Sequence, residues 1–556
     1  MIQSQRFQHA FLLVFCMVML GLFLFTVISR VGYPYDLEWM EGGVLLHGYR
    51  VLNGEDLYPY PSEEYIPFIY PPLYYWMLAG VAWCTKLDYP AGRILSIVGG
   101  LLSCAAVVRA LRWEGVSWCV ALCGGAFFLS TYEDTGAFLD IVRADGILLA
   151  LMAWSMVWVR EGKIRMGALA LSLAFATKHN AAIMGFPIAF WLWRHSGWRV
   201  AWQFSLWSAV PSLLFLGGMQ WVTEGRFLTY LLEVPAHHPF VLWRLTWLSS
   251  YEILSAHMML SLTGLALSMW WLLREKRNIL CWAGVVGSCI IMSMILLSKP
   301  MEGLFSQLIH VDGVSAKMVG RNAMGVLFCF ATGILLYSIW NKVRRPISSG
   351  YGYWILCAGV AWVFSGIMRA HHGGYNNVLL PGMWGSALCC GLLLHEIWNR
   401  FPKLRWGWVV LVGSHLWFVS WNPSLLIPTS KDVLAGDRLI ARLQEIDGPV
   451  FSPHAPWYPV IAGKKPSAHL IALWDIKHKG GPFYSSVTVI EEAVANREFT
   501  AILLANNKED YGRKKHYRKR ERIVYPSKKV FFPKKGWRVR PQYLFFPKDY
   551  KEESKK

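Results

Sequence analysis

The sequence predicts an α-helical polytopic membrane protein with about 13 transmembrane helices and a small C-terminal α/β domain. Hydrophobic residues make up 55% of the 556 residues and charged residues only 16%, whereas soluble globular chains carry roughly 25% charged residues. Apolar runs long enough to cross a bilayer recur from residue 10 to residue 421. The 30 tryptophans also fit, because Trp is enriched where a membrane meets water. We therefore expect the lipid bilayer to surround most of this chain.

The predicted membrane helices follow the apolar runs in order. They cover residues 10–29, 91–111, 116–132, 145–159, 166–178, 181–194, 201–221, 253–273, 279–297, 322–340, 352–368, 375–397 and 406–421. Residues 166–194 also fit one long helix, which would place every later loop on the opposite side of the membrane. The first run follows a single basic residue, Arg6, and no small-residue cleavage site comes after it. We therefore interpret it as a retained span rather than a removed signal peptide.

Basic residues alternate between the two sides of this arrangement. Six short loops each hold at least two Lys or Arg: residues 109–113, 160–165, 194–199, 274–278, 341–345 and 399–405. The opposite loops are longer and richer in Pro, Gly, His and acids. Since cytoplasmic loops carry the excess of Lys and Arg, we predict a cytoplasmic N-terminus and an extracytoplasmic C-terminal domain. The protein would lie in the inner or plasma membrane of the cell, with its first outer loop, residues 31–90, outside.

A change of composition after Trp421 divides the chain into a predicted transmembrane domain, residues 1–422, and a predicted extracytoplasmic α/β domain, residues 423–556. In the second domain "DVLAGDRLIARLQEI" has helical spacing of apolar residues, and "PVFSP" and "TAILLA" are typical of short buried strands. Its tail, residues 508–556, is strongly basic. We expect this tail to meet anionic lipid head groups or a phosphorylated glycan rather than nucleic acid, with a solvated tail lacking a fixed partner as the alternative.

Cysteine usage indicates neither a disulfide framework nor a metal site. Most of the 11 cysteines lie inside apolar runs, and none follows Cys390. Their spacing does not match that of metal ligands. We interpret them as small buried apolar residues.

The first outer loop begins with three acids within six residues, in "YPYDLEWMEGGVLLHGYRVLNGEDLYPY". Asp36 is expected to cap a helix that "NG" at 53–54 ends, and Glu38 and Glu41 then share one face. The helix dipole alone accounts for Glu38, but three acids beside a bilayer favour a catalytic or metal role. A carboxylate there can take a proton from a hydroxyl nucleophile, or Asp36 and Glu41 can hold a divalent metal against a phosphate.

Further ionisable residues lie at the outer ends of the predicted spans. Arg143 and Asp145 precede one span, and either a site role or a mutual salt bridge with helix capping explains them. Lys178 either contacts a phosphate or extends to the membrane interface. The other candidates are polar side chains of the outer loops, namely His237, His238, His371, His372, Lys317 and Arg321.

Several motifs together resemble a known family. The acidic motif after the first span, followed by "PPLYYW" at 71–76, resembles the polyprenyl-phosphate-dependent GT-C glycosyltransferases, which include the protein O-mannosyltransferases and the lipid A aminoarabinose transferase. "RADGILLAL" at 143–151 looks like the family's Asp at the start of its fourth span. "FATKHNAAI" at 175–183 looks like its Thr-Lys-Gly turn, and "GGYNNVLLPG" at 373–382 looks like its late Tyr-Leu-Pro stretch. The layout agrees over nearly the whole chain, through short motifs.

This resemblance implies a GT-C-like fold, an active site on the non-cytoplasmic face and a polyprenyl-phosphate sugar donor. The family's adjacent Asp-Glu pair would fall on Met40 and Glu41, so Asp36 or Glu38 would supply the missing carboxylate. One of the three acids would then be the base. The implied donor-phosphate and substrate-binding residues are Arg143, Asp145, Lys178, His179, His237, His238 and Tyr375.

The predicted function is that of an integral membrane glycosyltransferase. It would move a sugar from a polyprenyl-phosphate-linked donor to a lipid, glycan or protein acceptor on the extracytoplasmic face, with no nucleic acid partner. A transporter or flippase for a lipid-linked glycan is the alternative from another class, because it also needs cations for a phosphate. A membrane scaffold whose basic soluble domain does the work is a second alternative. Neither the sugar nor the acceptor follows from likeness of fold.

Overall fold

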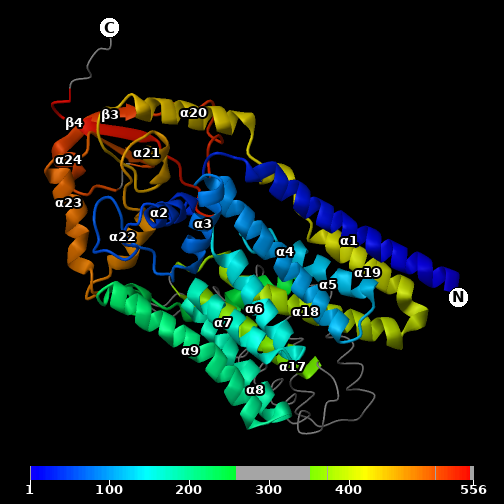
Figure 1. The fold of residues 1–556 in the computed structure, drawn as a ribbon. Coiled ribbons are helices and arrows are strands. Elements are labelled where there is room, and N and C mark those ends of the chain that lie inside the picture. Colours follow the sequence, from blue (N-terminus) through cyan, green and yellow to red (C-terminus); the bar gives the residue numbers. More distant parts are fainter. Residues whose placement is uncertain (1, 258–350, 372, 507–508, 551–556) are drawn as a thin grey trace, which may run out of the picture.

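The computed structural model describes residues 2–257, 351–371, 373–506 and 509–550 (Figure 1). Within these residues, ten helices coincide with predicted spans: α1 (Ile2–Val31), α4 (Tyr89–Trp113), α5 (Trp118–Ser130), α6 (Asp145–Arg160), α7 (Ile164–Thr177), α8 (Gly185–Ser196), α9 (Trp198–Val222), α17 (Tyr351–Ala370), α18 (Leu380–Arg400) and α19 (Arg405–Phe418). The predicted spans 279–297 and 322–340 lie outside the described residues, as does most of 253–273, where α12 (Ser249–Ala256) begins. The count of about 13 therefore stays a prediction.

The length and composition of the helices identify an integral membrane protein. In the described part of the chain, five helical segments are long and apolar enough to cross a bilayer: Gln5–Val31, Tyr89–Trp113, Trp198–Val222, Tyr351–Ala370 and Asn376–Arg400. A sixth is present if the bent pair Pro402–Leu425 and Ser430–Gln444 is one span. The helices α5 and α7 are apolar but shorter.

The helix is interrupted at Lys178, so residues 166–194 form two helices rather than one. The helix α7 ends at Thr177, Lys178 has an extended backbone with φ −147° and ψ 121°, and a 3₁₀ turn over His179–Met184 leads into α8. This break matters for the site, because it sets a lysine at the end of a helix instead of within one.

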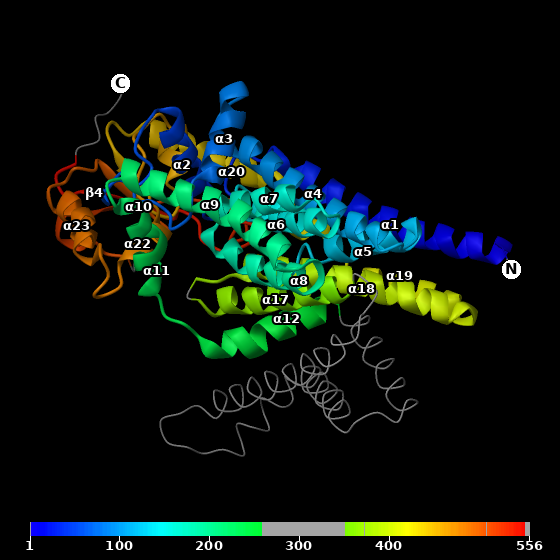
Figure 2. The ribbon, with the colours of Figure 1, turned by 60° about the horizontal axis from the view of Figure 1, so that its bottom comes forward.

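The basic loops and the acidic first loop lie at opposite ends of the helical bundle (Figures 1 and 2). Arg109 pairs with Glu161 across two basic loops, and the His9 ring near the N-terminus stacks on Trp398 close to a third. At the other end, the residues after α1 contact the C-terminal part of the chain. Among the described loops, the basic and acidic ones thus lie apart, as the sequence predicts. The basic loops 274–278 and 341–345 lie outside the described residues. Which end faces the cytoplasm stays a prediction.

The C-terminal part of the chain combines helices with one mixed sheet. Its elements are α20 (Ser430–Gln444), β1 (Val450–Phe451), α21 (Trp457–Ile461), α22 (Leu470–Ile476), α23 (Thr488–Ala495), β2 (Ala501–Leu504), α24 (Arg513–His516), β3 (Tyr517–Arg522) and β4 (Tyr543–Pro547). The strand order is β1-β2-β4-β3, with β1 and β2 parallel and the other pairs antiparallel. Two segments of the basic tail, β3 and β4, belong to this sheet. The partner expected for the tail stays a prediction.

The first loop is held between the helical bundle and this C-terminal unit. The carbonyl oxygen of Leu37 accepts the backbone N–H groups of Lys534 and Lys535 at 2.9 and 3.1 Å. The Tyr35 hydroxyl donates to Asp437 at 2.6 Å. The tail segment therefore lies directly against the acidic stretch of the first loop.

The helix predicted after Asp36 begins later than expected. It is α2 (Glu41–Leu52), and a second helix, α3 (Leu73–Cys84), follows Pro72 directly. The Glu41 carboxylate accepts the N–H groups of Leu37 and Glu38, which holds residues 37–40 in a turn and delays the helix. Asp36 is not the N-cap, but its carboxylate still accepts the Gly42 N–H at 3.1 Å. The predicted end is confirmed, since Asn53 is the C-cap of α2.

The helices α4 and α6 approach closely at two glycines. A Cβ at Gly99 would lie 2.4 Å from the backbone carbonyl carbon of Gly146, and one at Gly146 would lie 2.7 Å from the carbonyl oxygen of Ser96. Small residues allow helix backbones to pack at this distance in a membrane. The contact fixes how far the start of α6, where Asp145 lies, stands from α4.

We expect Gly99→Ala to destabilise the protein by about 1–3 kcal/mol, because the added methyl group meets backbone that cannot move aside. Thermal unfolding of the purified protein in detergent measures the effect. Gly21→Ala is the matched control, since Gly21 also lies within a helix but a Cβ there meets no atom within 4 Å. Equal losses for the two variants would show that the close approach of α4 and α6 is unimportant.

Candidate active site

The most heavily bonded acid of the first loop is Glu41. Both partners of its ion pair with Arg93 on α4 are fully buried, and the guanidinium binds the carboxylate with two hydrogen bonds, Nε to Oε1 at 2.9 Å and Nη2 to Oε2 at 2.8 Å. The N–H groups of Val142 and Leu37 also donate to Glu41, at 2.8 and 2.6 Å. Each oxygen thus has a charged and a backbone donor, and this favours a positioning role for Glu41 over the predicted role of base.

The same pairing bears on the predicted metal. The Arg93 guanidinium stands against Glu41, where a cation shared by Asp36 and Glu41 would have to lie. Within the described residues, no group of three or more His, Cys, Asp or Glu side chains has the geometry to hold a metal ion. Asp36 and Glu41 therefore do not fit a metal site, and no step of the chemistry below uses one.

Asp36 is buried at the edge of the C-terminal unit. Its carboxylate Oδ1 accepts hydrogen bonds from the Tyr89 hydroxyl at 3.0 Å and from the Gly42 N–H. Its own N–H donates to the Tyr458 hydroxyl at 3.4 Å. Burial and the nearby charge of Glu41 raise the pKa of the Asp36 carboxyl well above its ordinary value. This environment disfavours the ionised carboxylate, the form that a base requires.

Glu38 has the environment that suits a general base. Burial raises its pKa to about 7, although the Arg143 charge acts in the opposite direction. The guanidinium Nη1 of Arg143 lies 3.7 Å from Oε2 of Glu38. A carboxyl group with a pKa near the working pH transfers protons most effectively. Of the three acids in the first loop, Glu38 therefore fits the role of base best.

Arg143 connects Glu38 to a second cluster around Asp145, the first residue of α6. Its Nε lies 3.7 Å from Oδ2 of Asp145. On the other oxygen of Asp145, Lys178 Nζ donates at 2.6 Å and Asn377 Nδ2 donates at 2.9 Å. Negatively and positively charged side chains thus alternate along the row Glu38, Arg143, Asp145 and Lys178. Because Lys178 is buried in this cluster, its interpretation as a side chain that extends to the membrane interface is wrong.

Beside this cluster lies a cavity of about 310 Å³ with two kinds of wall. Asp145, Lys178, Asn180 and Asn377 form its polar part, and the remaining lining residues are apolar, namely Leu148, Leu149, Phe364, Met368, Val378, Leu380 and Pro381. The Oδ2 atom of Asp145 has no hydrogen bond among the described residues. A cavity with charged side chains at one part and apolar side chains around the rest suits a ligand that has a charged head group and an apolar chain.

The remaining predicted site residues fall into two groups. His179 follows Lys178 directly, and Tyr375 lies 5.7 Å, ring to ring, from Phe138, on which Arg143 stacks. These residues border the cluster of charges. Among the described residues, no hydrogen bond joins His237 or His238 to Asp145 or Lys178: the ring of His237 bonds to Glu233 of its own turn, and that of His238 bonds to the backbone of Asp475. Lys317, Arg321 and His372 lie outside the described residues.

Sequence reasoning missed three partners that complete the cluster. Arg93 lies two residues inside a predicted span, and an ionisable residue there is a signal that could have identified it. Asn377 bonds Asp145, and the Tyr70 ring lies 4.8 Å from the Lys178 ammonium. Asn377 lies inside the stretch 373–382 that the sequence singled out, but only the fold brings it and Tyr70 beside α6.

No family model and no curated protein matches the chain. Among solved structures, it is similar to ArnT from Cupriavidus metallidurans in the apo state, with 12% identity and a TM-score of 0.46 over 96% of this chain and 97% of that one. It is similar to the same protein bound to undecaprenyl phosphate, with 12% identity and a TM-score of 0.45 over the same shares. A third neighbour is the arabinosyltransferase EmbB from Mycobacterium smegmatis, with 12% identity and a TM-score of 0.32 over 81% of this chain and 42% of that one. Likeness of this degree does not fix a reaction.

We expect Arg93→Met to destabilise the protein by about 3–5 kcal/mol, because it leaves the buried Glu41 carboxylate without its cation. Arg400→Met is the control: the Arg400 side chain is 66% exposed in its pair with Glu396, and an exposed pair contributes about 0–1 kcal/mol. Chemical denaturation of both variants in detergent gives the two losses. A small loss for Arg93→Met would mean that Glu41 does not depend on this pair and is free for chemistry.

Proposed function

We propose that this protein is an integral membrane glycosyltransferase that takes a sugar from a polyprenyl-phosphate-linked donor and passes it to an acceptor outside the cytoplasm. One observation carries the proposal: Glu38, Arg143, Asp145 and Lys178 form a row of alternating charges, and the last two of them line a cavity with a polar part and apolar walls. A donor made of a sugar, a phosphate and a long hydrocarbon chain has the matching chemistry.

The donor phosphate would bind at Lys178, with Arg143 beside it. Among the described residues the Lys178 ammonium makes one hydrogen bond, to Asp145, so two of its three N–H donors are available to a phosphate. Asp145 and the ring of Tyr70 hold the ammonium in place. A positioned cation lowers the energy of the transition state, because charge develops on the phosphate oxygen as the sugar departs. The polyprenyl chain would lie along the apolar walls of the cavity.

The chemical step would be a direct displacement at the anomeric carbon. An acceptor hydroxyl oxygen forms the new glycosidic bond while the bond from that carbon to the phosphate oxygen breaks. Glu38 takes the hydroxyl proton, and polyprenyl phosphate leaves with the electron pair. Attack opposite the leaving group inverts the configuration of the anomeric carbon. Glu38 then returns its proton to water, and Glu41 takes no part except to hold the loop.

The transporter alternative uses only part of this arrangement. A flippase also needs cations for a lipid-linked phosphate, but it has no use for a carboxyl group whose pKa is raised to about 7 beside them. Glycan analysis separates the two, because loss of transport leaves a sugar on the wrong side of the membrane and loss of transfer leaves it on its carrier.

We expect Lys178→Ala and Glu38→Gln to abolish one sugar modification of a cell-envelope glycan or glycolipid while the lipid-linked donor accumulates. Lys178→Ala would act by weakening donor binding and Glu38→Gln by removing the base. Mass spectrometry of envelope glycans and lipid extracts from cells at matched expression measures both quantities.

Lys465→Ala is the control for this comparison, since the Lys465 side chain is 73% exposed and pairs only with a surface acid, Glu64. It should leave both quantities unchanged. Envelope glycans that stay intact in both site variants but change when the gene is deleted would reject glycosyl transfer at this site.

We expect the rate of transfer to rise with pH with a midpoint near 7, because Glu38 must be deprotonated to act as a base and its pKa is about 7. Transfer rates in membrane vesicles across the neutral range measure this profile. In Glu38→Gln the remaining rate should lack the rise. A midpoint unchanged in that variant would assign the base to another residue.

The same group makes stability depend on pH. In the folded protein the pKa of Glu38 is raised from 4.5 to about 7, so the folded state binds a proton that the unfolded state has already lost. Relative to Glu38→Gln, the intact protein should therefore lose stability as pH rises from 4.5 toward 7.

A further inference from the structure

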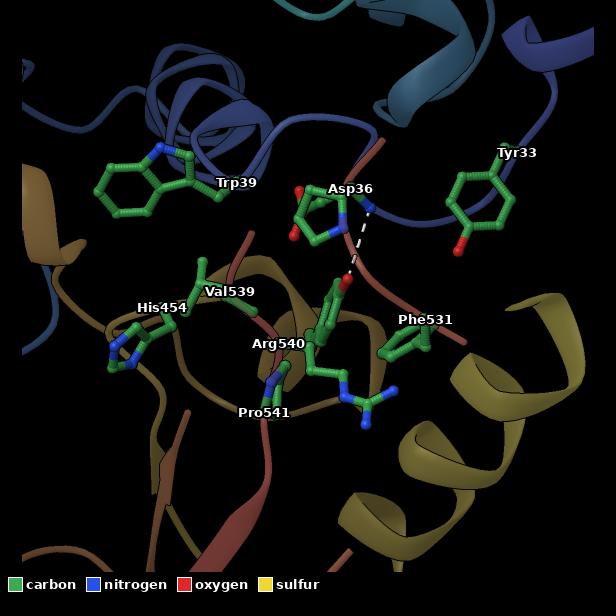
Figure 3. A pocket seen from close by; sticks show the side chains of 11 residues that line it. Tyr33, Asp36, Trp39, His454, Phe531, Val539, Arg540 and Pro541 are labelled. Atoms are coloured by element: carbon green, nitrogen blue, oxygen red, sulfur yellow. Dashed lines mark hydrogen bonds between the residues drawn. The ribbon is translucent and has the colours of Figure 1, made fainter. Parts of the chain in front are cut away.

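A second cavity, of about 270 Å³, lies at the seam between the first loop and the C-terminal unit (Figure 3). We call it the seam cavity. Tyr33, Asp36 and Trp39 line it from the first loop, and His454, Tyr458 and Arg540 line it from the C-terminal unit. Two parts of the chain more than 400 residues apart thus meet around it, as the hydrogen bond from the Asp36 N–H to the Tyr458 hydroxyl shows.

The seam cavity contains polar nitrogen atoms that make no hydrogen bond among the described residues. His454 is 3% exposed, and neither of its ring nitrogens has a hydrogen bond among the described residues. Its Nε2 lies 3.6 Å from the Glu509 carboxylate, beyond hydrogen-bond distance. The Nε of Arg540 is likewise buried without a hydrogen bond in the described part of the chain. Buried polar groups are normally paired, so these point to a ligand that supplies the missing partners.

A wall of tryptophans continues from this cavity to the surface. The Trp39 ring meets that of Trp537 edge to face at 5.2 Å, and Trp537 lies 5.5 Å from Trp474. Trp474 and Trp537 are 37% and 39% exposed, although neither lies in a membrane span. Their rings therefore offer an apolar surface to water, and such a patch beside unpaired polar groups is typical of a binding site.

These features match the chemistry of a sugar ring. A pyranose has an apolar face of C–H groups that packs on indole rings, and hydroxyls around its edge that bond to carboxylate, imidazole and guanidinium groups. A lipid chain would leave the His454 ring nitrogens and the Arg540 Nε without a hydrogen bond, which costs free energy.

We propose that the acceptor is a glycan, and that one of its sugar rings stacks on the exposed tryptophan wall at the mouth of the seam cavity. This inference rests on the proposed function. The wall adjoins the proposed base: Gly536 precedes Trp537 and packs so closely on Glu38 that a Cβ at Gly536 would lie 2.7 Å from Oε1 of that carboxylate. A glycan bound here thus lies beside the segment that packs on Glu38.

The test is binding of defined oligosaccharides, neutral and acidic, to the full-length protein in detergent, first on a printed array and then by titration of the tightest binder. We expect Trp474→Ala and Trp537→Ala to weaken binding about tenfold or more each, because buried or stacked Trp residues dominate the energy of such contacts. His454→Gln should weaken it as well. Trp537→Phe should recover part of the affinity, since it keeps a ring.

Trp406→Ala is the matched control. Trp406 is 45% exposed but lies on α19, near Phe11 at the end of the bundle with the basic loops. Its substitution should leave oligosaccharide binding unchanged. Thermal unfolding of each variant shows whether a loss of binding reflects a loss of fold, and the exposed Trp474 and Trp537 variants are expected to fold.

The outcomes separate this inference from the proposed function. If the tryptophan variants bind an oligosaccharide as tightly as the intact protein does, the seam cavity is not its site and the inference is overturned. If no oligosaccharide on the array binds, while Lys178→Ala still stops sugar transfer in cells, the protein is a transferase whose acceptor is not a glycan. If oligosaccharides bind through the tryptophans but Lys178→Ala changes no envelope sugar, the proposed function fails, and with it the glycan as acceptor.

Discussion

The buried ion pair between Glu41 and Arg93 is the interaction on which the rest of the site depends. Two charges removed from water are costly to bury, and the cost is offset only when every donor and acceptor is satisfied. Here the guanidinium also donates to the carbonyl oxygens of Tyr33 and Tyr35, while the carboxylate accepts from Val142 before α6. One pair therefore ties the end of α1, the first loop, α2, α4 and the start of α6 into a single rigid element.

The ion pair also separates the three acids of the first loop by their surroundings. With Glu41 committed to Arg93 and Asp36 held at the seam with the C-terminal unit, Glu38 is the acid that lies beside Arg143 and the Asp145 cluster. The C-terminal unit contributes directly, because its tail segment bonds Leu37 and covers the loop. The seam cavity and the tryptophan wall exist only where these two parts of the chain meet, so the C-terminal unit is part of the site rather than an appendage to it.

Much of the arrangement could be predicted from local sequence, and the errors have physical causes. Ten predicted spans match described helices, because a helix that crosses a bilayer needs a long apolar run, and such a run can be recognised in the sequence alone. Lys178 was identified from a short motif, and the structure adds that it ends a helix and pairs with Asp145. The sequence left open which of Asp36, Glu38 and Glu41 is the base, because neighbouring acids look alike in sequence. The partner that distinguishes Glu41, Arg93, lies 52 residues away.

The sequence by itself determined that this chain spans a membrane, where its helices lie, that its basic loops alternate with acidic ones, and which segment carries the carboxylates. These properties depend on composition and local spacing, which need no knowledge of distant contacts. Only the tertiary structure shows the surroundings of each acid, the partners of Lys178 and the seam cavity. A carboxylate's basicity depends on burial and on charges within a few ångströms, and in this protein those neighbours come from segments dozens to hundreds of residues apart.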